Sequence, residues 1–226
     1  MRLLLAALPL LFVNAGSAAD SLPPILAKMD SASATFKGLM ADMLKLHHTA
    51  IINEDEVDTG SLVVRRPKPK DLQVLFDIKQ PNPQQFAFSG RKAEKFNPKT
   101  NTVEVYDVDK KYGSLINRYM LLGFGASPSE LQQSYKIVFG GPENVGDKKT
   151  TRIELTPKET DTALHLVKAE LWISDETGIA LQQKLSYGGG DYDLATYTNM
   201  KVREDIPESA VKLNLPKNVK REYPLK

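Results

Sequence analysis

The stretch Lys168–Lys184 reads "KAELWISDETGIALQQK", two extended runs joined by an Asp-Glu-Thr-Gly turn. In the first run, Ala169, Leu171 and Ile173 share one face, because side chains alternate along a strand. A lone hairpin is barely stable in water, so this apolar face must meet another part of the chain. We expect the hairpin to belong to a larger sheet and its apolar face to line a hollow.

Further strand-like runs lie on both sides of this hairpin. "GSLVVRRPKP", "DLQVLFDIKQP" and "QQFAFSGRK" alternate in hydrophobicity or are bounded by Pro, Gly and Asn turn signals. In total the chain predicts about eleven strands in an antiparallel arrangement. A sheet of that size curls to bury its apolar face. The pattern therefore predicts a mainly β, α+β protein with a large curved sheet.

Three segments have helical signals instead. A short amphipathic helix is expected over about Pro24–Ala34. Ser127, Pro128 and Glu130 form the capping box of a second helix. Between them, five residues fall on one helical face: Tyr112, Leu115, Ile116, Tyr119 and Met120. Helices that interrupt a curled sheet could form a lid over its open side.

The N-terminus has the pattern of a secretory signal peptide. A basic start at Met1-Arg2 precedes an apolar run over Leu3–Val13, and small residues surround a cleavage site after Ala18 or Ala19. The apolar run is shorter than the roughly 20 residues that a membrane-spanning helix needs, although an uncleaved anchor is the alternative. We expect residues 1–18 to be removed and residues 19–226 to form one domain outside the cytoplasm.

Composition excludes several classes of function. Lys and Arg total 30 against 28 Asp and Glu, so no excess of positive charge points to a nucleic-acid partner. The chain contains no cysteine, which excludes disulfides, thiolate metal sites and a cysteine nucleophile. The overall amino-acid composition is that of an ordinary globular protein.

No motif for catalysis or metal binding emerges. His47 and His48 are adjacent on an expected strand, so they point to opposite faces and cannot easily share a metal. The acidic run Asn53–Asp58 fits a solvated hairpin loop, with calcium binding as a weaker alternative because its spacing is not that of an EF-hand. The "YGGGDYD" segment fits a bulge or wide turn. We therefore expect no catalytic residue, no metal, no cofactor and no enzymatic activity.

Apolar side chains of three central strands share one face. Burial of this surface stabilises the protein by about 25 cal/mol per Å², whether the partner is protein or lipid. The sequence leaves open whether these residues fill a core or line a cavity. The set comprises Leu62, Val64, Leu72, Val74, Phe76, Phe86 and Phe88.

Arg66 shares a strand face with Leu62 and Val64, just before Pro67. A buried guanidinium is costly unless its five donors are bonded, so Arg66 could bind backbone carbonyls of a capping helix. The alternative is that the strand bends at Pro67 and Arg66 reaches solvent.

The order of several pieces resembles the LolA family of periplasmic outer-membrane lipoprotein carriers. These are the signal peptide, "GSLVVRRPKP", the helical insertion, "IELTPK", "LWISDETG" and "LNLPKNV". The resemblance implies an unclosed half-barrel with a lid of short α-helices, and an arginine, here Arg66, that holds the lid closed. It also places Phe36 and Met40 at positions where the family has cavity-lining aromatic residues.

The resemblance implies a periplasmic, monomeric protein that carries lipoprotein or lipid cargo from an inner-membrane donor complex to an outer-membrane acceptor. Leu115, Ile116, Tyr119 and Met120 would belong to the lid. The alternative is a non-enzymatic lipid-binding or envelope-stress interaction module of the same fold, although such regulators usually carry a second domain.

Overall fold

The computed structural model describes residues 21–68, 71–107, 122–159 and 165–224. The expected signal peptide and the expected helix around Leu115 and Tyr119 lie outside these ranges.

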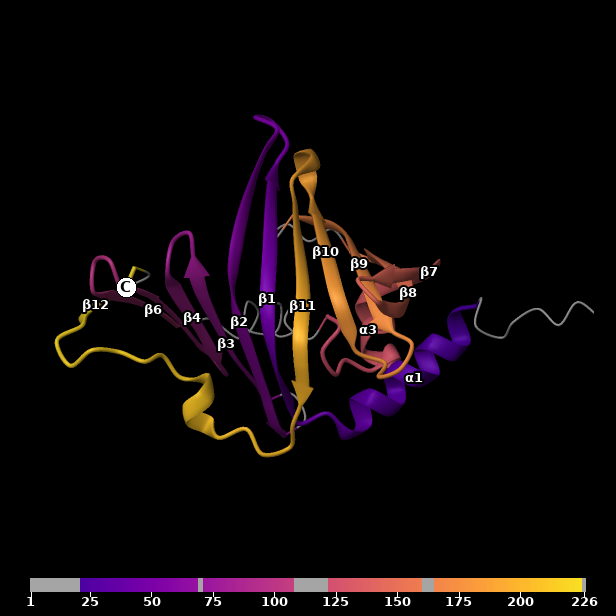
Figure 1. Cartoon of the computed structure of the whole chain (residues 1–226), viewed down its shortest axis with the longest axis horizontal. Helices are drawn as coiled ribbons and strands as arrows, with labels where there is room; N and C mark the ends of the chain where they lie inside the picture. Colours follow the sequence, from indigo (N-terminus) through magenta and orange to yellow (C-terminus); the bar gives the residue numbers. More distant parts are fainter. Residues whose placement is uncertain (1–20, 69–70, 108–121, 160–164, 225–226) are drawn as a thin grey trace, which may run out of the picture.

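One twelve-stranded sheet dominates the described residues (Figure 1). Its spatial order is β12-β6-β5-β4-β3-β2-β1-β11-β10-β9-β8-β7, so β12 and β7 are its two edges and the sheet does not close. All paired neighbours are antiparallel except β12 and β6, which are parallel. The strands are β1 Gly38–Thr49, β2 Glu54–Lys68, β3 Asp71–Gln80, β4 Gln84–Ser89, β5 Lys92–Asn97, β6 Thr102–Asp107, β7 Tyr135–Val145, β8 Lys148–Pro157, β9 Leu166–Ser174, β10 Ala180–Tyr187, β11 Tyr192–Val202 and β12 Lys220–Glu222.

The predicted fold class, a mainly β protein with an unclosed half-barrel and few helices, is confirmed. The strand count differs slightly from about eleven, because the short parallel strand β12 carries no alternating pattern to reveal it.

Two described α-helices accompany the sheet. Helix α1 spans Leu22–Thr35, with a proline in its first turn. Helix α3 spans Pro128–Ser134, and Ser127 and Glu130 form the predicted capping box: each side chain accepts a hydrogen bond from the other residue's backbone N–H. Short 3-10 helices occur at Gly188–Gly190 and Glu208–Val211.

Strand register divides the sheet into two faces. Directly paired residues point to the same side, and the pairs Leu39–Val64, Val64–Val74 and Val74–Phe88 define what we call the inner face. The intervening residues, such as Val63 and Leu75, define the outer face. Helices α1 and α3 cover the inner face, whereas the chain after β11 crosses the outer one (Figure 1).

The inner face carries two apolar clusters. The cluster under α1 and α3, which we call the helix cluster, includes Ile25 and Met29 of α1 packed on Ile153, Leu171 and Ile173 of the sheet. The central cluster lies on β1, β2, β3 and β11, and Phe36 and Phe124 pack on it. The quoted hairpin forms β9 and β10, and its apolar face is covered by the helices.

The acidic run at Asn53–Asp58 is not the hairpin loop that its composition predicts. The turn is at residues 50–53, and Glu54 already begins β2. Acidic residues are unfavourable in strands, but here most of them are exposed on a hairpin that extends into solvent. The glycine run after β10 forms a single 3-10 turn, with positive φ at Gly189 and Gly190.

Candidate functional site

Most of the apolar residues expected at the site lie together on the inner face. Leu62, Val64, Leu72 and Val74 are each 1% exposed and belong to the central cluster, with Phe76 partly buried beside them. Phe88 is 4% exposed, whereas Phe86, one pair further along β3 and β4, is 38% exposed. In the described structure this surface is therefore packed, and it could receive a ligand only if its cover moved.

Met40 lies on the other face, which corrects the expectation that it lines the same surface as Phe36. Met40 pairs with Val63 of the outer face and is 40% exposed. Its neighbours Leu39 and Ala41 are the ones that point inward. The resemblance paired Met40 with Phe36, but Phe36 precedes β1, so strand alternation does not put the two side chains on one face.

Phe36 and Phe124 cover the central cluster. Phe36 follows the last residue of α1 and is 2% exposed. Phe124 is 3% exposed and meets Tyr197 edge to face, with ring centroids 4.9 Å apart. The side chains that complete the inner surface thus come from α1 and from residues 122–126, which we call the cover segment.

Arg66 connects both parts of this cover to β2. Its Nη1 donates to the Gly125 carbonyl at 2.7 Å, and its Nη2 donates to the Ser33 carbonyl at 2.5 Å. Nη2 and Nε also donate to the Phe36 carbonyl, at 3.1 and 3.3 Å. The guanidinium carbon lies 5.3 Å from the centre of the Phe36 ring.

Two of the three carbonyls that Arg66 binds, those of Ser33 and Phe36, are among those that a helix end leaves unpaired. Ser33 is in the last turn of α1, and Phe36 is its C-cap. A cation at this end also interacts favourably with the helix dipole. Burial lowers the pKa of the Arg66 guanidinium, while the charge of Glu130 acts in the opposite direction. Arginine nevertheless remains charged in proteins, so the contact is a cation on neutral carbonyls.

Two glycines let the cover segment lie against the sheet. Gly123 has φ +87° and Gly125 φ +75°, a region that other residues rarely adopt. A Cβ on Gly125 would come within 2.5 Å of the Phe36 ring, and one on Gly123 within 2.4 Å of the Ala180 Cβ. Close packing of the cover therefore requires glycine at both positions.

Gln183 of β10 holds the other end of the cover segment. Its side-chain amide donates to the Leu122 carbonyl, and its carbonyl oxygen accepts from the Tyr197 hydroxyl at 3.2 Å. The backbone N–H of Ala180 donates to the Gly123 carbonyl at 3.0 Å. Complete burial raises the pKa of Tyr197, so its hydroxyl stays protonated and remains a donor.

A polar cluster lies further along the inner face, beyond the apolar surface. Asp193 of β11 accepts hydrogen bonds from His47 Nδ1 at 2.8 Å and from the Tyr187 hydroxyl at 2.9 Å, and Lys45 Nζ lies 3.5 Å away. Burial and the charge of Asp193 raise the pKa of Tyr187. As expected, His48 points to the other face, where it stacks on Tyr192 and contacts Asp55.

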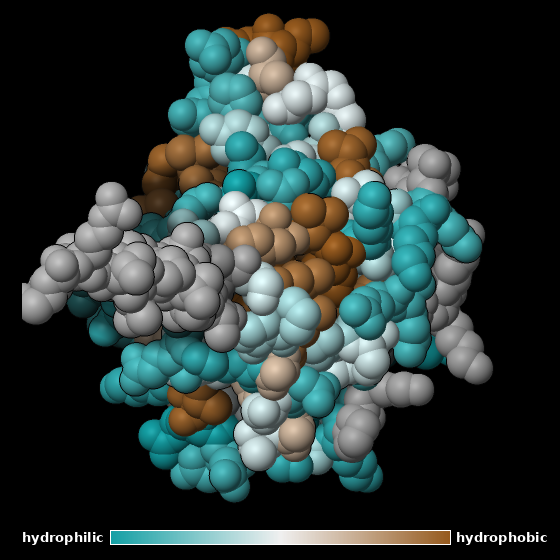
Figure 2. Space-filling model, turned by 90° about the vertical axis from the view of Figure 1, so that its right-hand side faces the viewer, coloured by the Kyte–Doolittle hydropathy of each residue, from teal (hydrophilic) through white to brown (hydrophobic). Residues whose placement is uncertain are grey.

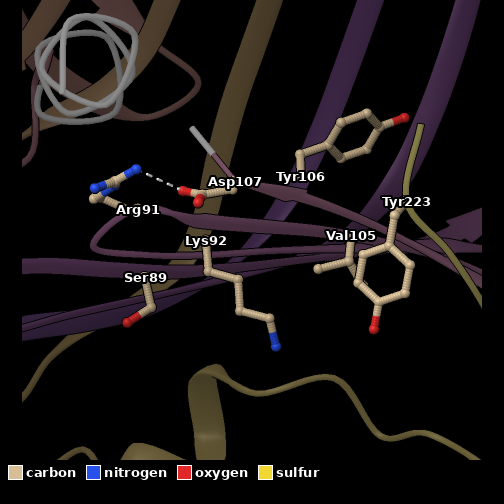
Figure 3. A pocket seen from close by; sticks show the side chains of 7 residues that line it. All are labelled: Ser89, Arg91, Lys92, Val105, Tyr106, Asp107 and Tyr223. Atoms are coloured by element: carbon tan, nitrogen blue, oxygen red, sulfur yellow. Dashed lines mark hydrogen bonds and ion pairs between the residues drawn. The ribbon is translucent and has the colours of Figure 1, made fainter. Parts of the chain in front are cut away.

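A separate hollow of about 350 Å³ opens away from this site, where β5, β6 and the segment after β12 meet (Figure 3). Val105 and Tyr223 both line it, Arg91 is paired with Asp107, and the Tyr106 side chain points away from Lys92 and Val105. Its walls come mainly from the outer face, so it is not the apolar site expected from the sequence.

The side of the molecule that carries α1, α3 and β7 has an apolar patch at its centre, surrounded by polar atoms (Figure 2). Leu22, Leu26 and Ile137 are partly exposed members at the margin of the helix cluster on these elements. Apolar surface thus reaches the exterior on the side where the helices cover the sheet.

Phe124, Gln183 and Tyr197 were missed by sequence reasoning. The "GFG" motif at Gly123–Gly125 was a usable signal for Phe124, because an aromatic residue between two glycines suits a tight chain against a packed surface. Gln183 and Tyr197 carry no comparable signal, since polar residues on strands usually face solvent.

Solved structures of other proteins share this architecture. An uncharacterised conserved protein from Thermus thermophilus aligns with a TM-score of 0.55 and 10% identity, over 88% of this chain and 96% of that one. MucB aligns with a TM-score of 0.51 and 12% identity, over 84% of this chain. The chain therefore shares its fold with these two proteins.

This chain spans about 61% of the length of the MucB chain that it matches. A LolA superfamily protein from Nitrosomonas europaea also aligns, with 13% identity, over 84% of this chain and 96% of that one, at a TM-score of 0.41 that is too low to support an argument. No family model matches the sequence, and no curated protein does. At these identities the likeness establishes the fold alone.

Two kinds of feature are absent from the described ranges. None of the helices within them is long and apolar enough to cross a membrane. Nor do three or more His, Asp or Glu side chains in those ranges gather so that they could hold a metal ion.

Proposed function

We propose that this protein is a periplasmic carrier that binds the acyl chains of lipoproteins on its inner face and ferries them from the inner to the outer membrane. The LolA-like fold supports the class of function. The apolar inner face supports the chemistry of the cargo. In this proposal residues 1–18 are a cleaved signal peptide, the rest forms one domain, and the protein has no enzymatic activity.

The observation that carries the proposal is the attachment of the cover. Arg66 bonds three carbonyls from two separate segments, α1 and the cover segment, directly beside the apolar surface. Hydrogen bonds to neutral carbonyls can break without leaving a buried anion unpaired. Each contributes about 0.5–1.5 kcal/mol net, or somewhat more with a charged donor. The attachment is therefore strong enough to hold the cover and weak enough to be displaced.

Acyl chains could supply the energy to displace it. Each methylene moved from water to an apolar environment contributes roughly 0.8 kcal/mol. A few methylenes on the inner face would thus balance the bonds of Arg66. Conversely, when an acceptor offers the acyl chains another apolar environment, closure of the cover would favour release of the chains. Phe36, Leu62, Val64, Leu72, Val74, Phe76, Phe86 and Phe88 would line the site, with Arg66 controlling the cover.

The test is transfer of a diacylated, fluorescently labelled lipopeptide from the loaded protein to acceptor vesicles. Arg66→Leu should slow release by roughly tenfold to a hundredfold, because loss of two or three hydrogen bonds weakens closure by about 1.5–3 kcal/mol. Arg65→Leu is the matched control: this neighbour lies on the outer face and bonds Ile206 and Gln73. Equal release rates for wild type and Arg66→Leu would contradict the proposal.

A second candidate is a non-enzymatic interaction module of the same fold. It is favoured by the packing of the central cluster, which leaves the described inner face filled by the protein itself. MucB, one of the similar folds, has been solved in complex with MucA. Native mass spectrometry on protein purified gently from a bacterial envelope separates the two: bound acyl lipid supports the carrier, and a mass that stays apo after incubation with lipoprotein-loaded membranes supports the module.

A further inference from the structure

The turn between β1 and β2 has two strongly exposed isoleucines. Ile51 is 92% exposed and Ile52 is 60% exposed, the highest values among the large apolar residues that the structure describes. They are the central residues of the turn at residues 50–53, which projects at the top of the molecule in Figure 1, where Figure 2 also shows apolar atoms. Folding gains nothing from apolar side chains at such a position, which points to a role in binding.

The turn is held in one conformation. The Asn53 N–H donates to the Ala50 carbonyl at 3.2 Å, and Asn53 has φ +51°. The Ala50 N–H donates to Asp191 Oδ1 at 2.8 Å, which fixes the turn to the neighbouring loop between β10 and β11. Below it, His48 stacks on Tyr192. A fixed turn loses little conformational entropy when its tip is buried by a partner.

Acidic side chains lie beside the apolar tip, on the β2 side of the hairpin. Glu54, Asp55 and Glu56 follow the turn directly, all exposed, and Asp58 is close behind. Asp55 contacts His48. Within the described part of the chain, neither Glu54 nor Glu56 forms an ion pair. Such a tip is electrostatically unsuited to an anionic lipid surface and suited to a positively charged protein surface.

We infer that the β1–β2 turn is a docking site for a protein partner, whose surface offers an apolar pocket for Ile51 and Ile52 and basic side chains around it for Glu54 and Glu56. The tip lies about 40 Å along β2 from Arg66, at about 3.3 Å per residue. A partner bound there would leave the inner-face cover free to move. Docking and cargo handling therefore use opposite ends of the same strand.

The experiment begins with a photoreactive residue in place of Ile51 in the full chain, expressed in its native host. Val167, 52% exposed on β9, takes the same residue as the control position. We expect one protein adduct from position 51 and none of the same mass from position 167. Lipid adducts alone, or no adduct at 51, would overturn the inference.

The crosslinked protein is then identified, purified and tested for binding. Ile51→Ser combined with Ile52→Ser should weaken binding at least tenfold, and Glu54→Lys combined with Glu56→Lys should weaken it and reduce its dependence on salt. Val167→Ser and Asp147→Lys, at other exposed positions, are the controls and should leave affinity unchanged. Unchanged melting temperatures should accompany all four variants.

Binding to vesicles of phosphatidylcholine, with and without phosphatidylglycerol, tests the alternative that the tip inserts into a membrane. We expect no binding of the wild-type protein to either. Vesicle binding that disappears in the Ile51→Ser, Ile52→Ser variant would show that the tip inserts into membranes, and equal affinity of all variants for the identified protein would show that the partner docks elsewhere. Either result would refute the inference.

Discussion

Two adjacent arginines, Arg65 and Arg66, attach different segments to opposite faces of the same sheet. On the outer face, Arg65 Nε donates to the Ile206 carbonyl at 2.9 Å, beside a small cluster of Val63, Ile206 and Val211. On the inner face, Arg66 bonds three carbonyls of α1 and the cover segment, beside the larger central cluster.

The difference lies in what each attachment leaves behind when it breaks. Release of the outer segment would expose only a small apolar cluster. Release of the inner cover would expose a continuous apolar surface, which is stable in water only if something else covers it. On both faces a guanidinium donates hydrogen bonds to backbone carbonyls. On the outer face these bonds only attach a segment to the sheet. On the inner face, in our proposal, they also hold a cover that opens when lipid binds.

The largest difference between the faces should appear in β1 itself. Met43 points into the central cluster at 4% exposed, whereas Met40 is 40% exposed on the outer face. Met43→Ala should lower the free energy of unfolding by about 2–4 kcal/mol through the cavity it leaves, and Met40→Ala by less than about 1 kcal/mol. Urea denaturation of both variants measures this. Equal losses would mean that the assignment of the faces is wrong.

Removal of each arginine compares the two attachments directly. Arg66→Leu should lower the free energy of unfolding by about 2–3 kcal/mol, because two carbonyls at the end of α1 and one in the cover segment lose their donor. Arg65→Leu should cost about 1 kcal/mol. Arg66→Lys should behave like the leucine variant, since one ammonium cannot reach three carbonyls at once. Full stability in Arg66→Lys would show that charge alone holds the cover.

A backbone substitution should disturb the inner cover without touching a hydrogen-bonding side chain. In Gly125→Ala the new Cβ would meet the Phe36 ring, and the positive φ would also be strained, for a cost of about 1–3 kcal/mol. Gly90→Ala is the control: Gly90 has φ +61° but no atom within 4 Å of the added Cβ. Thermal melting should show the greater loss for Gly125→Ala, and equal losses would attribute the effect to φ alone.

The smallest expected effect concerns pH. On β7, the Glu143 carboxylate accepts hydrogen bonds from Trp172 Nε1 at 2.6 Å and from Arg152 Nε at 2.7 Å. The bond from Trp172 is the main cause that lowers the pKa of Glu143, and Arg152 acts in the same direction. Partial burial acts in the opposite direction. A carboxylate with a lowered folded-state pKa contributes full stability above the unfolded value, near 4.5, and loses it as the pH falls through the folded value.

Because Glu143 is well exposed, this contribution is about 0.5 kcal/mol or less. Glu143→Gln should therefore lower stability near neutrality by this small amount and flatten the stability profile slightly below pH 4.5. The Arg66 contacts, which join a permanent cation to neutral carbonyls, should show no pH dependence between about pH 5 and 8. If the rate of amide hydrogen exchange in the cover changed over that pH range, a titrating group would also hold the cover.

Local signals in the sequence predicted much of this fold. The alternation in "KAELWISDETGIALQQK" predicted β9 and β10, and the Ser-Pro-Ser-Glu motif predicted the start of α3, because both depend on neighbouring residues alone. Parity placed Arg66 on the face of Leu62 and Val64, and its side chain does contact helix-end carbonyls. Its role in controlling a lid stays a prediction.

The remainder depends on contacts between distant segments. The partners of Arg66 are 30 to 59 residues away in sequence, and Phe124 reaches the sheet only because Gly125 approaches Phe36. Strand β12 is three residues long and gains its partner from β6. No periodicity encodes such pairings, and the family resemblance that placed Met40 on the inner face was wrong about its strand parity.

The most direct test of the account is amide hydrogen exchange of the protein with and without a diacylated lipopeptide. We predict that bound lipopeptide speeds exchange in the last turn of α1 and in residues 122–126, because the Arg66 bonds have broken, while Ile206–Val211 on the outer face stays unchanged. Stoichiometric binding with exchange in the inner cover unaltered or slowed would contradict the claim that the cover opens to admit acyl chains.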